Sequence, residues 1–185
     1  MAGIYKENIQ DYEKAMEYYD KSIGVNPDFA LAHNNKALLL YYKLGKVEEA
    51  IEFYDKSIVL DSENDVYFYN RGRFYEEEGN YEMALKDYIQ AKELNPDDSE
   101  YYFRMAYCYD ALDQYENSLS TYREYIEQFG EVSSVYNNMA TIYDENVQDY
   151  DKALEYYDKA IELSPEEALY HRNKAELLHL SLIHI

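Results

Sequence analysis

Two stretches of the chain are near-copies of each other. Residues 3–28 read GIYKENIQDYEKAMEYYDKSIGVNPD, and residues 141–166 read TIYDENVQDYDKALEYYDKAIELSPE. Sixteen of these 26 positions are identical, at an offset of 141 − 3 = 138 residues. Similar segments at a fixed offset indicate a repeat architecture, in which stacked units share one continuous core.

The 138-residue offset contains a shorter period of 34 or 35 residues. A small residue recurs at this period, at Ala15, Ala50, Ala84, Ser118 and Ala153. A tyrosine follows four residues after each of them, at Tyr19, Tyr54, Tyr88, Tyr122 and Tyr157. The three prolines, at positions 27, 96 and 165, are 69 residues apart, which is two periods. The repeating unit is therefore about 34 residues long.

Each unit has room for two helices. In residues 81–94 the apolar and small side chains recur three, four and seven residues apart, which predicts an amphipathic helix. We call this type of helix B and the helix that precedes it A. The B helices are expected at 11–25, 46–60, 81–94, 115–128 and 149–163. The A helices are expected at 29–43, 66–78, 99–112, 133–146 and 167–180. Short loops make neighbours antiparallel, so the prediction is an all-α protein, an α-solenoid.

Local signals support these boundaries. Asp11, Asn80 and Asp149 each precede a B helix and are expected to cap its N-terminus. Gly45 and Gly79 lie in the turns from A to B, where a permissive backbone is needed.

The unit at residues 65–98 resembles the tetratricopeptide repeat (TPR) family. It has Phe68, Gly72, Tyr75, Gly79, Tyr81, Ala84, Tyr88, Ala91 and Pro96 in family order. The other units carry Ala37, Ala106, Ala140 and Ala175 at the position of Gly72. The resemblance implies a right-handed superhelix of antiparallel helix pairs, with a concave groove lined by the A helices.

We expect residues 1–179 to form a single TPR-like solenoid. Its units are predicted at 1–29 (partial), 30–64, 65–98, 99–132, 133–167 and 168–179 (partial). The units starting at 30 and 133 hold one extra residue between their helices. The unit at 99–132 has Tyr125 in place of a small residue, so altered packing is expected there.

Both ends of the sequence fall inside an expected A helix. This suggests a fragment of a longer array, with exposed ends through which copies could self-associate. Residues 180–185 abandon the repeat pattern and resemble translated vector sequence, hence the hypothesis that this tail is not native.

Composition excludes several partner classes. With 17 basic and 38 acidic residues the formal charge is 17 − 38 = −21 at pH 7, so no nucleic-acid partner is expected. There is no run of about 18 apolar residues, so membrane insertion is not expected. No signal peptide is visible, and the single Cys108 suits a reducing compartment, so we expect a cytoplasmic protein.

No residue pattern points to catalysis, so the chain is not predicted to be an enzyme and no cofactor is expected. The histidines, at 33, 171, 179 and 184, lack the spacing of a helical zinc site, and no metal site is expected. His33 and His171 occupy equivalent packing positions, and Cys108 is interpreted as a buried structural thiol.

The resemblance places one set of polar and aromatic residues on the inner face of the A helices. These candidate peptide-binding residues are Asn34, Asn35, Tyr69, Asn70, Arg73, Phe103, Arg104, Tyr107, Asn137, Asn138, Arg172 and Asn173. An asparagine side chain can both donate to and accept from a peptide backbone, and an arginine can clamp a carboxylate.

The resulting hypothesis is a non-catalytic protein–protein interaction scaffold that binds a peptide or helix of a partner in the concave groove. The alternative is a structural or oligomerising array that positions a catalytic or membrane domain of a larger parent protein. A basic partner on the convex face also remains open, given the acidic charge.

Overall fold

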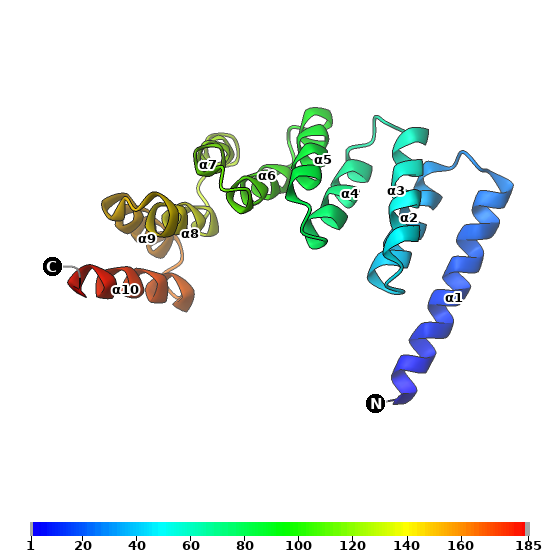
Figure 1. Ribbon diagram of the computed structural model, residues 1–185, viewed down its shortest axis with the longest axis horizontal. Coiled ribbons are helices and arrows are strands. Elements are labelled where there is room, and N and C mark those ends of the chain that lie inside the picture. Colours follow the sequence, from blue (N-terminus) through cyan, green and yellow to red (C-terminus); the bar gives the residue numbers. More distant parts are fainter. Residues whose placement is uncertain (1, 184–185) are drawn as a thin grey trace. The chain divides into compact units, whose positions relative to one another are not determined.

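The computed structural model describes residues 2–183, with side chains for residues 12–179. The described residues form helices and connecting loops, without any strand. The chain divides into two compact units, Met1–Asp97 and Asp98–Ile185, called unit 1 and unit 2 below. The prediction of an all-helical fold of antiparallel pairs is confirmed in each unit (Figure 1).

Unit 1 contains the first five helices. They are α1 (Ala2–Val25), α2 (Ala30–Tyr42), α3 (Val47–Leu60), α4 (Asp65–Glu77) and α5 (Tyr81–Leu94). Helix α2 packs against α3, and α4 packs against α5, as the A and B helices of one repeat. Helix α1 packs against α2, and α3 against α4, which joins successive repeats.

The start of α5 shows how local sequence sets a boundary. The Asn80 side chain accepts a hydrogen bond from the Met83 backbone N–H at 3.2 Å, which confirms the predicted cap. The preceding Gly79 has φ +75°, the left-handed conformation that favours glycine. The turn from α4 to α5 is therefore encoded in these two adjacent residues.

Unit 2 contains the remaining helices. They are α6 (Ser99–Ala111), α7 (Tyr115–Phe129), α8 (Ser133–Thr141), the π-helix η1 (Ile142–Val147), α9 (Tyr150–Leu163) and α10 (Ala168–Ile183). Helix α6 packs against α7, α8 against α9, and α9 against α10. Asp149 caps α9 as predicted, because its carboxylate accepts from the Lys152 N–H at 3.2 Å.

The extra residue predicted between the helices of the 133–167 unit is accommodated by a wider helical turn. Helix α8 continues directly into η1, and Gln148 then takes a left-handed conformation with φ 58°. A π-turn inserts one residue into a helix without breaking its axis. The continuation rotates the side chains of η1 relative to those of α8.

The expected break between an A and a B helix near residue 11 is wrong. Helix α1 runs without interruption from Ala2 to Val25, so Asp11 lies inside a helix and not at its N-terminus. The near-copy at 141–150 does turn, at Gln148. In that copy, α8 packs against α9 and holds the two helices antiparallel. Residues 3–12 instead lie within the single helix α1, which packs against α2.

The core of each unit follows the repeat of small and aromatic residues. Ala50, Ala84, Ser118 and Ala153 are fully buried, as are Tyr54 and Tyr88. Close approach of two helices at a small residue leaves space beside it for a large ring. Tyr125 is accommodated by an aromatic cluster, in which its ring centre lies 5.3 Å from that of Phe129.

Other predicted packing roles hold as well. Cys108 is fully buried. The Nε2 atoms of His33 and His171 donate to the carbonyls of Pro27 and Pro165, at 2.9 and 2.8 Å. These histidines therefore tie each A helix to the loop before it.

Ion pairs connect a B helix to the next A helix at several junctions. Asp20 pairs with Lys36, Asp55 with Arg71, and Asp158 with Lys174. In each pair the cation is 16 residues after the carboxylate.

We expect Tyr54→Phe to raise the stability of the protein by about 1 kcal/mol, because an unpaired buried hydroxyl costs free energy. The Tyr54 hydroxyl is buried and has no hydrogen-bond partner among the described residues. The matched control is Tyr88→Phe, since the Tyr88 hydroxyl donates to Glu76 at 2.7 Å. Urea unfolding should show a higher midpoint for Tyr54→Phe and a lower one for Tyr88→Phe. A lower midpoint for both would contradict the argument.

Candidate functional site

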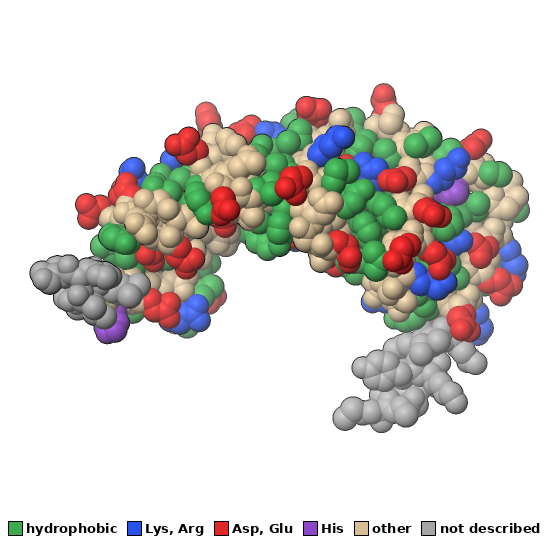
Figure 2. All heavy atoms as spheres, viewed as in Figure 1, with side chains coloured by type: hydrophobic (Ala, Val, Ile, Leu, Met, Phe, Trp, Pro, Cys, Tyr) green, Lys and Arg blue, Asp and Glu red, His purple; other side chains and the backbone are tan. Residues whose placement is uncertain are grey.

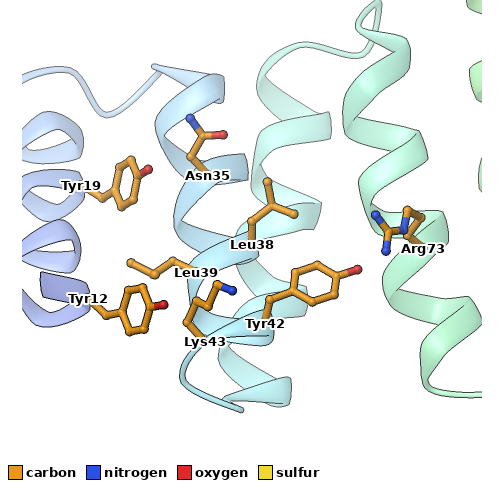
Figure 3. Close-up of a pocket in the computed structure, with 8 residues that line it drawn as sticks. All are labelled: Tyr12, Tyr19, Asn35, Leu38, Leu39, Tyr42, Lys43 and Arg73. Atoms are coloured by element: carbon orange, nitrogen blue, oxygen red, sulfur yellow. The ribbon is translucent and has the colours of Figure 1, made fainter. Parts of the chain in front are cut away.

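The inner-face residues of unit 1 lie on α2 and α4. Asn35 and Arg73 line a cavity of about 550 Å³ in this unit. Six further residues complete its lining, namely Tyr12, Tyr19, Leu38, Leu39, Tyr42 and Lys43 (Figure 3). Helix α1 contributes Tyr12 and Tyr19 to one side, and α4 contributes Arg73 to the other. The cavity therefore opens along the A helices and is bounded by the preceding B-type helix.

The lining combines an apolar floor with two cations. The Arg73 guanidinium lies 5.5 Å from the centre of the Tyr42 ring and donates to Glu77 at 3.1 Å. The Tyr42 hydroxyl also donates to Glu77, at 2.8 Å, so this carboxylate holds both side chains in place. Lys43 is exposed and forms no ion pair with the residues whose side chains are described.

These contacts change the titration of the cavity groups. Burial raises the pKa of the Tyr42 phenol, and the hydrogen bond to Glu77 raises it further. Burial alone would lower the pKa of Arg73, but Tyr42, Tyr69 and Glu77 raise it overall. Both cation and phenol therefore keep their protons at neutral pH. The Tyr42 proton is donated to Glu77, and the other N–H groups of Arg73 can donate to a ligand.

Two of the predicted groove asparagines in unit 1 are used within the protein. The Asn70 amide donates to the Asn34 side-chain oxygen at 3.0 Å, from α4 to α2. The Asn34 amide in turn donates to Asn35 at 3.3 Å, and Asn34 is only 2% exposed. Asn34 is thus part of the helix packing. Tyr69 packs on the Tyr88 ring, with centres 5.9 Å apart.

The same arrangement recurs in unit 2. The Asn173 amide donates to the side-chain oxygen of buried Asn137 at 3.0 Å, from α10 to α8. The Asn138 amide donates to the Tyr122 hydroxyl at 3.1 Å. Phe103 lies edge-on to the Tyr122 ring at 5.9 Å. These four predicted groove residues are therefore engaged in packing within unit 2.

The remaining inner-face residues of unit 2 are more open. Arg104 donates to Glu100 at 2.7 Å, and Arg172 lies 3.6 Å from Glu176. Tyr107 is 43% exposed. One cavity of unit 2 is lined by residues 113–117 and 147, and another is lined by residues between 116 and 152. Arg104, Arg172 and Tyr107 belong to neither lining.

Sequence reasoning missed several residues of the unit 1 cavity, although a signal was present. Asn35, Leu38, Leu39 and Tyr42 follow the i, i+3, i+4, i+7 spacing of one helical face. Following the same helical face from the predicted Asn35 would have identified Leu38, Leu39 and Tyr42 as well. Tyr12 and Tyr19 lie on the expected B helix at 11–25, and the groove was assigned to the A helices, so these two residues were not included.

The described residues contain no group of three or more histidine, cysteine, aspartate or glutamate side chains able to hold a metal ion. None of their helices combines the length and apolar character needed to cross a membrane. Acidic side chains are spread over the face of the molecule seen in Figure 2, and they do not gather at one place.

Comparison with known families decides the identity of the repeat. Models described as tetratricopeptide repeat match residues 66–98, residues 100–131, and both 1–29 and 133–167. A further model, described as TPR repeat, matches residues 39–79. The chain belongs to the tetratricopeptide repeat family. No curated protein matches this TPR chain.

Solved structures support the TPR assignment and confirm the predicted α-solenoid class. YrrB, described as a TPR protein with an unusual peptide-binding site, is 25% identical and has a TM-score of 0.78. That match covers 91% of this chain and 86% of YrrB. MamA is 21% identical with a TM-score of 0.75, over 89% of this chain and 95% of MamA. PilF of Pseudomonas aeruginosa is 20% identical with a TM-score of 0.70, over 98% and 88%.

Proposed function

We propose that this TPR protein is a non-catalytic scaffold that binds an extended peptide or a helix of a partner protein in the groove of its A helices. Membership of the TPR family supports a role in protein–protein interaction. The observation that carries the proposal is the cavity of about 550 Å³ on α1, α2 and α4. It is large enough for side chains of a bound segment.

The chemistry of the cavity suits a peptide. Leu38 and Leu39 offer an apolar surface, and the three tyrosines Tyr12, Tyr19 and Tyr42 add aromatic area with polar ends. Such side chains lose little conformational entropy when they are covered. Asn35 can pair with a peptide backbone, and Lys43 and Arg73 favour a carboxylate nearby.

The similarity to YrrB adds support, since that TPR protein is described as having a peptide-binding site. The candidate peptide-binding residues in both units stay predictions, as does self-association through the ends. The alternative of a structural array for a larger parent also stays a prediction.

A peptide-display selection against the whole chain tests the proposal. We expect enriched peptides, and a synthesised peptide should bind with a measurable Kd in fluorescence polarisation. Arg73→Ala and Lys43→Ala should each weaken that binding about tenfold, because each removes a cation from the cavity.

Lys56→Ala is the matched control. Lys56 is exposed on α3 and does not line the cavity, and its replacement removes the same single positive charge. Its Kd should change less than about twofold, which separates local contacts from the net charge of the protein. Equal weakening by all three variants, or the absence of any enriched peptide, would count against the proposal.

A further inference from the structure

A second cavity lies in unit 2, beside the π-helix η1. Its volume is about 430 Å³. Three elements line it, with Glu116, Leu119 and Arg123 from α7, Tyr143 and Val147 from η1, and Lys152 from α9. None of these residues belongs to the predicted groove. The cavity is therefore a separate candidate for binding.

Arg123 differs from the other arginines of the chain. The sequence contains five arginines, and four of them lie within ion-pair distance of a carboxylate, namely Arg71, Arg73, Arg104 and Arg172. Arg123 is exposed and donates instead to the Tyr143 hydroxyl at 2.8 Å. Within residues 12–179 it pairs with no carboxylate. An unpaired cation in a chain of charge −21 calls for an explanation.

The repeat shows what Arg123 replaces. The residue after the repeating tyrosine is an aspartate in three other repeats, where it pairs with a cation of the next A helix. In this repeat the residue is Arg123, and the cation position is occupied by Met139. The charge at this position is thus reversed, and Arg123 makes a hydrogen bond to Tyr143 of the next repeat where the other repeats have an ion pair.

The π-helix supplies the group that orients Arg123. Tyr143 is 4% exposed, and its ring stacks on that of Tyr156 with centres 5.5 Å apart and planes 3° from parallel. Its hydroxyl accepts from Arg123, so the hydroxyl hydrogen is free to be donated. The Lys152 ammonium lies 5.1 Å from the centre of the same ring and 2.8 Å from Asp149.

We propose that this cavity binds a carboxylate of a partner peptide. The remaining N–H groups of Arg123, the Tyr143 hydroxyl and the Lys152 ammonium would donate to it, while Leu119 and Val147 cover a neighbouring aliphatic side chain. Glu116 is seven residues before Arg123 on α7, roughly 10 Å along the helix axis. Glu116 would repel a second acidic residue of the peptide at its end of the cavity. The peptide is therefore expected to bind in one orientation.

Three short peptides test the proposal on the whole chain. Acetyl-Leu-Glu-Leu-amide carries a side-chain carboxylate, acetyl-Leu-Gln-Leu with a free C-terminus carries a terminal one, and acetyl-Leu-Gln-Leu-amide carries none. Binding is followed by nitrogen–proton correlation NMR at the Arg123 side chain and the Leu119 and Val147 amides. We expect saturable shifts, with a Kd on the order of millimolar, for at least one carboxylate peptide and none for the neutral one.

Comparing the two carboxylate peptides distinguishes a side-chain ligand from a chain terminus. Arg123→Gln should weaken the binding about tenfold, because it removes the charge-assisted hydrogen bonds. Lys56→Gln, at an exposed lysine of α3 that lines neither cavity and is no candidate groove residue, should leave the Kd unchanged. Circular dichroism should show both variants folded. Shifts equal to those of the neutral peptide, or insensitive to Arg123→Gln, would overturn the proposal.

Discussion

Arg71→Met is expected to destabilise the protein by about 3–5 kcal/mol, because it leaves a buried carboxylate without its counter-ion. The Arg71 Nε and Nη2 atoms both donate to Asp87, each at 2.7 Å, and Nη1 donates to Asp55 at 2.6 Å. Asp87 is only 2% exposed, so water cannot replace the guanidinium. These bonds join α3, α4 and α5.

Burial of this ion pair has a cost in free energy. Burial raises the pKa of the Asp87 carboxyl above its ordinary value, even though the hydrogen bonds from Arg71 lower it in part. Burial likewise disfavours the charged form of Arg71, but hydrogen bonds to Asp87 and Asp55 outweigh this and raise its pKa. Desolvation of the carboxylate is therefore not fully offset, and an apolar replacement of both partners can be tolerated.

The chain offers a matched rescue for this variant. The next repeat carries Met105 and Thr121 at the positions of Arg71 and Asp87, and both are buried. Arg71→Met combined with Asp87→Thr should recover stability to within about 1.5 kcal/mol of the unmodified protein. Urea denaturation of the single and double variants measures both effects. If the double variant were as unstable as Arg71→Met, lost packing would be the cause and the electrostatic argument would fail.

Gly72→Ala is expected to destabilise the protein by about 1–3 kcal/mol, although four other repeats carry alanine at this position. A Cβ atom at Gly72 would lie 2.8 Å from Cε1 and 2.9 Å from Cδ1 of Tyr88. The Tyr88 ring is fully buried, and its hydroxyl is held by Glu76, so the ring cannot move away easily. The overlap outweighs the gain of about 1 kcal/mol that alanine usually brings to a helix.

A double-mutant cycle with Tyr88→Leu checks the cause. A smaller side chain at residue 88 removes the ring atoms nearest to the new Cβ. Gly72→Ala should therefore cost less in the Tyr88→Leu background than alone, with a coupling of about 1 kcal/mol or more. Ala106→Gly is a useful comparison, because it makes the opposite change at the equivalent position and should lower stability through helix propensity and lost packing. Additive effects of Gly72→Ala and Tyr88→Leu would exclude the steric explanation.

Much of the fold could be predicted from the sequence, because the repeat multiplies weak signals. The expected ranges for α2 to α9 agree with the structure to within one residue when α8 and η1 are taken together as one A helix. The small residues and tyrosines of one helical stripe recur in several copies, and the caps Asn80 and Asp149 act as expected. Where the copies differ, as at Gly72 and Ala106, the residue most common at that repeat position is a poor guide to the effect of a substitution. The contacts within the individual repeat decide that effect.

The candidate site was predicted less completely. The inner-face pattern identified Asn35 and Arg73, which line the unit 1 cavity, and also Asn34 and Asn137, which are buried. Sequence periodicity assigns a residue to a helix face, but it cannot say whether an asparagine on that face meets solvent or another asparagine 36 residues away. That depends on how closely neighbouring A helices approach.

The sequence by itself determined the period, the pairing of helices, the family and the small and aromatic positions of the core, because these depend on local spacing alone. Tertiary structure decided the rest. Residues 3–12 and 141–150 share seven of ten positions, yet the first lie within one continuous helix and the second pass through a π-turn and a left-handed Gln148. Packing of α8 against α9 favours the turn. Likewise, the pairing of Arg71 with Asp87 and of Arg123 with Tyr143 requires two separate helices to meet, a geometry that no single stretch of sequence encodes.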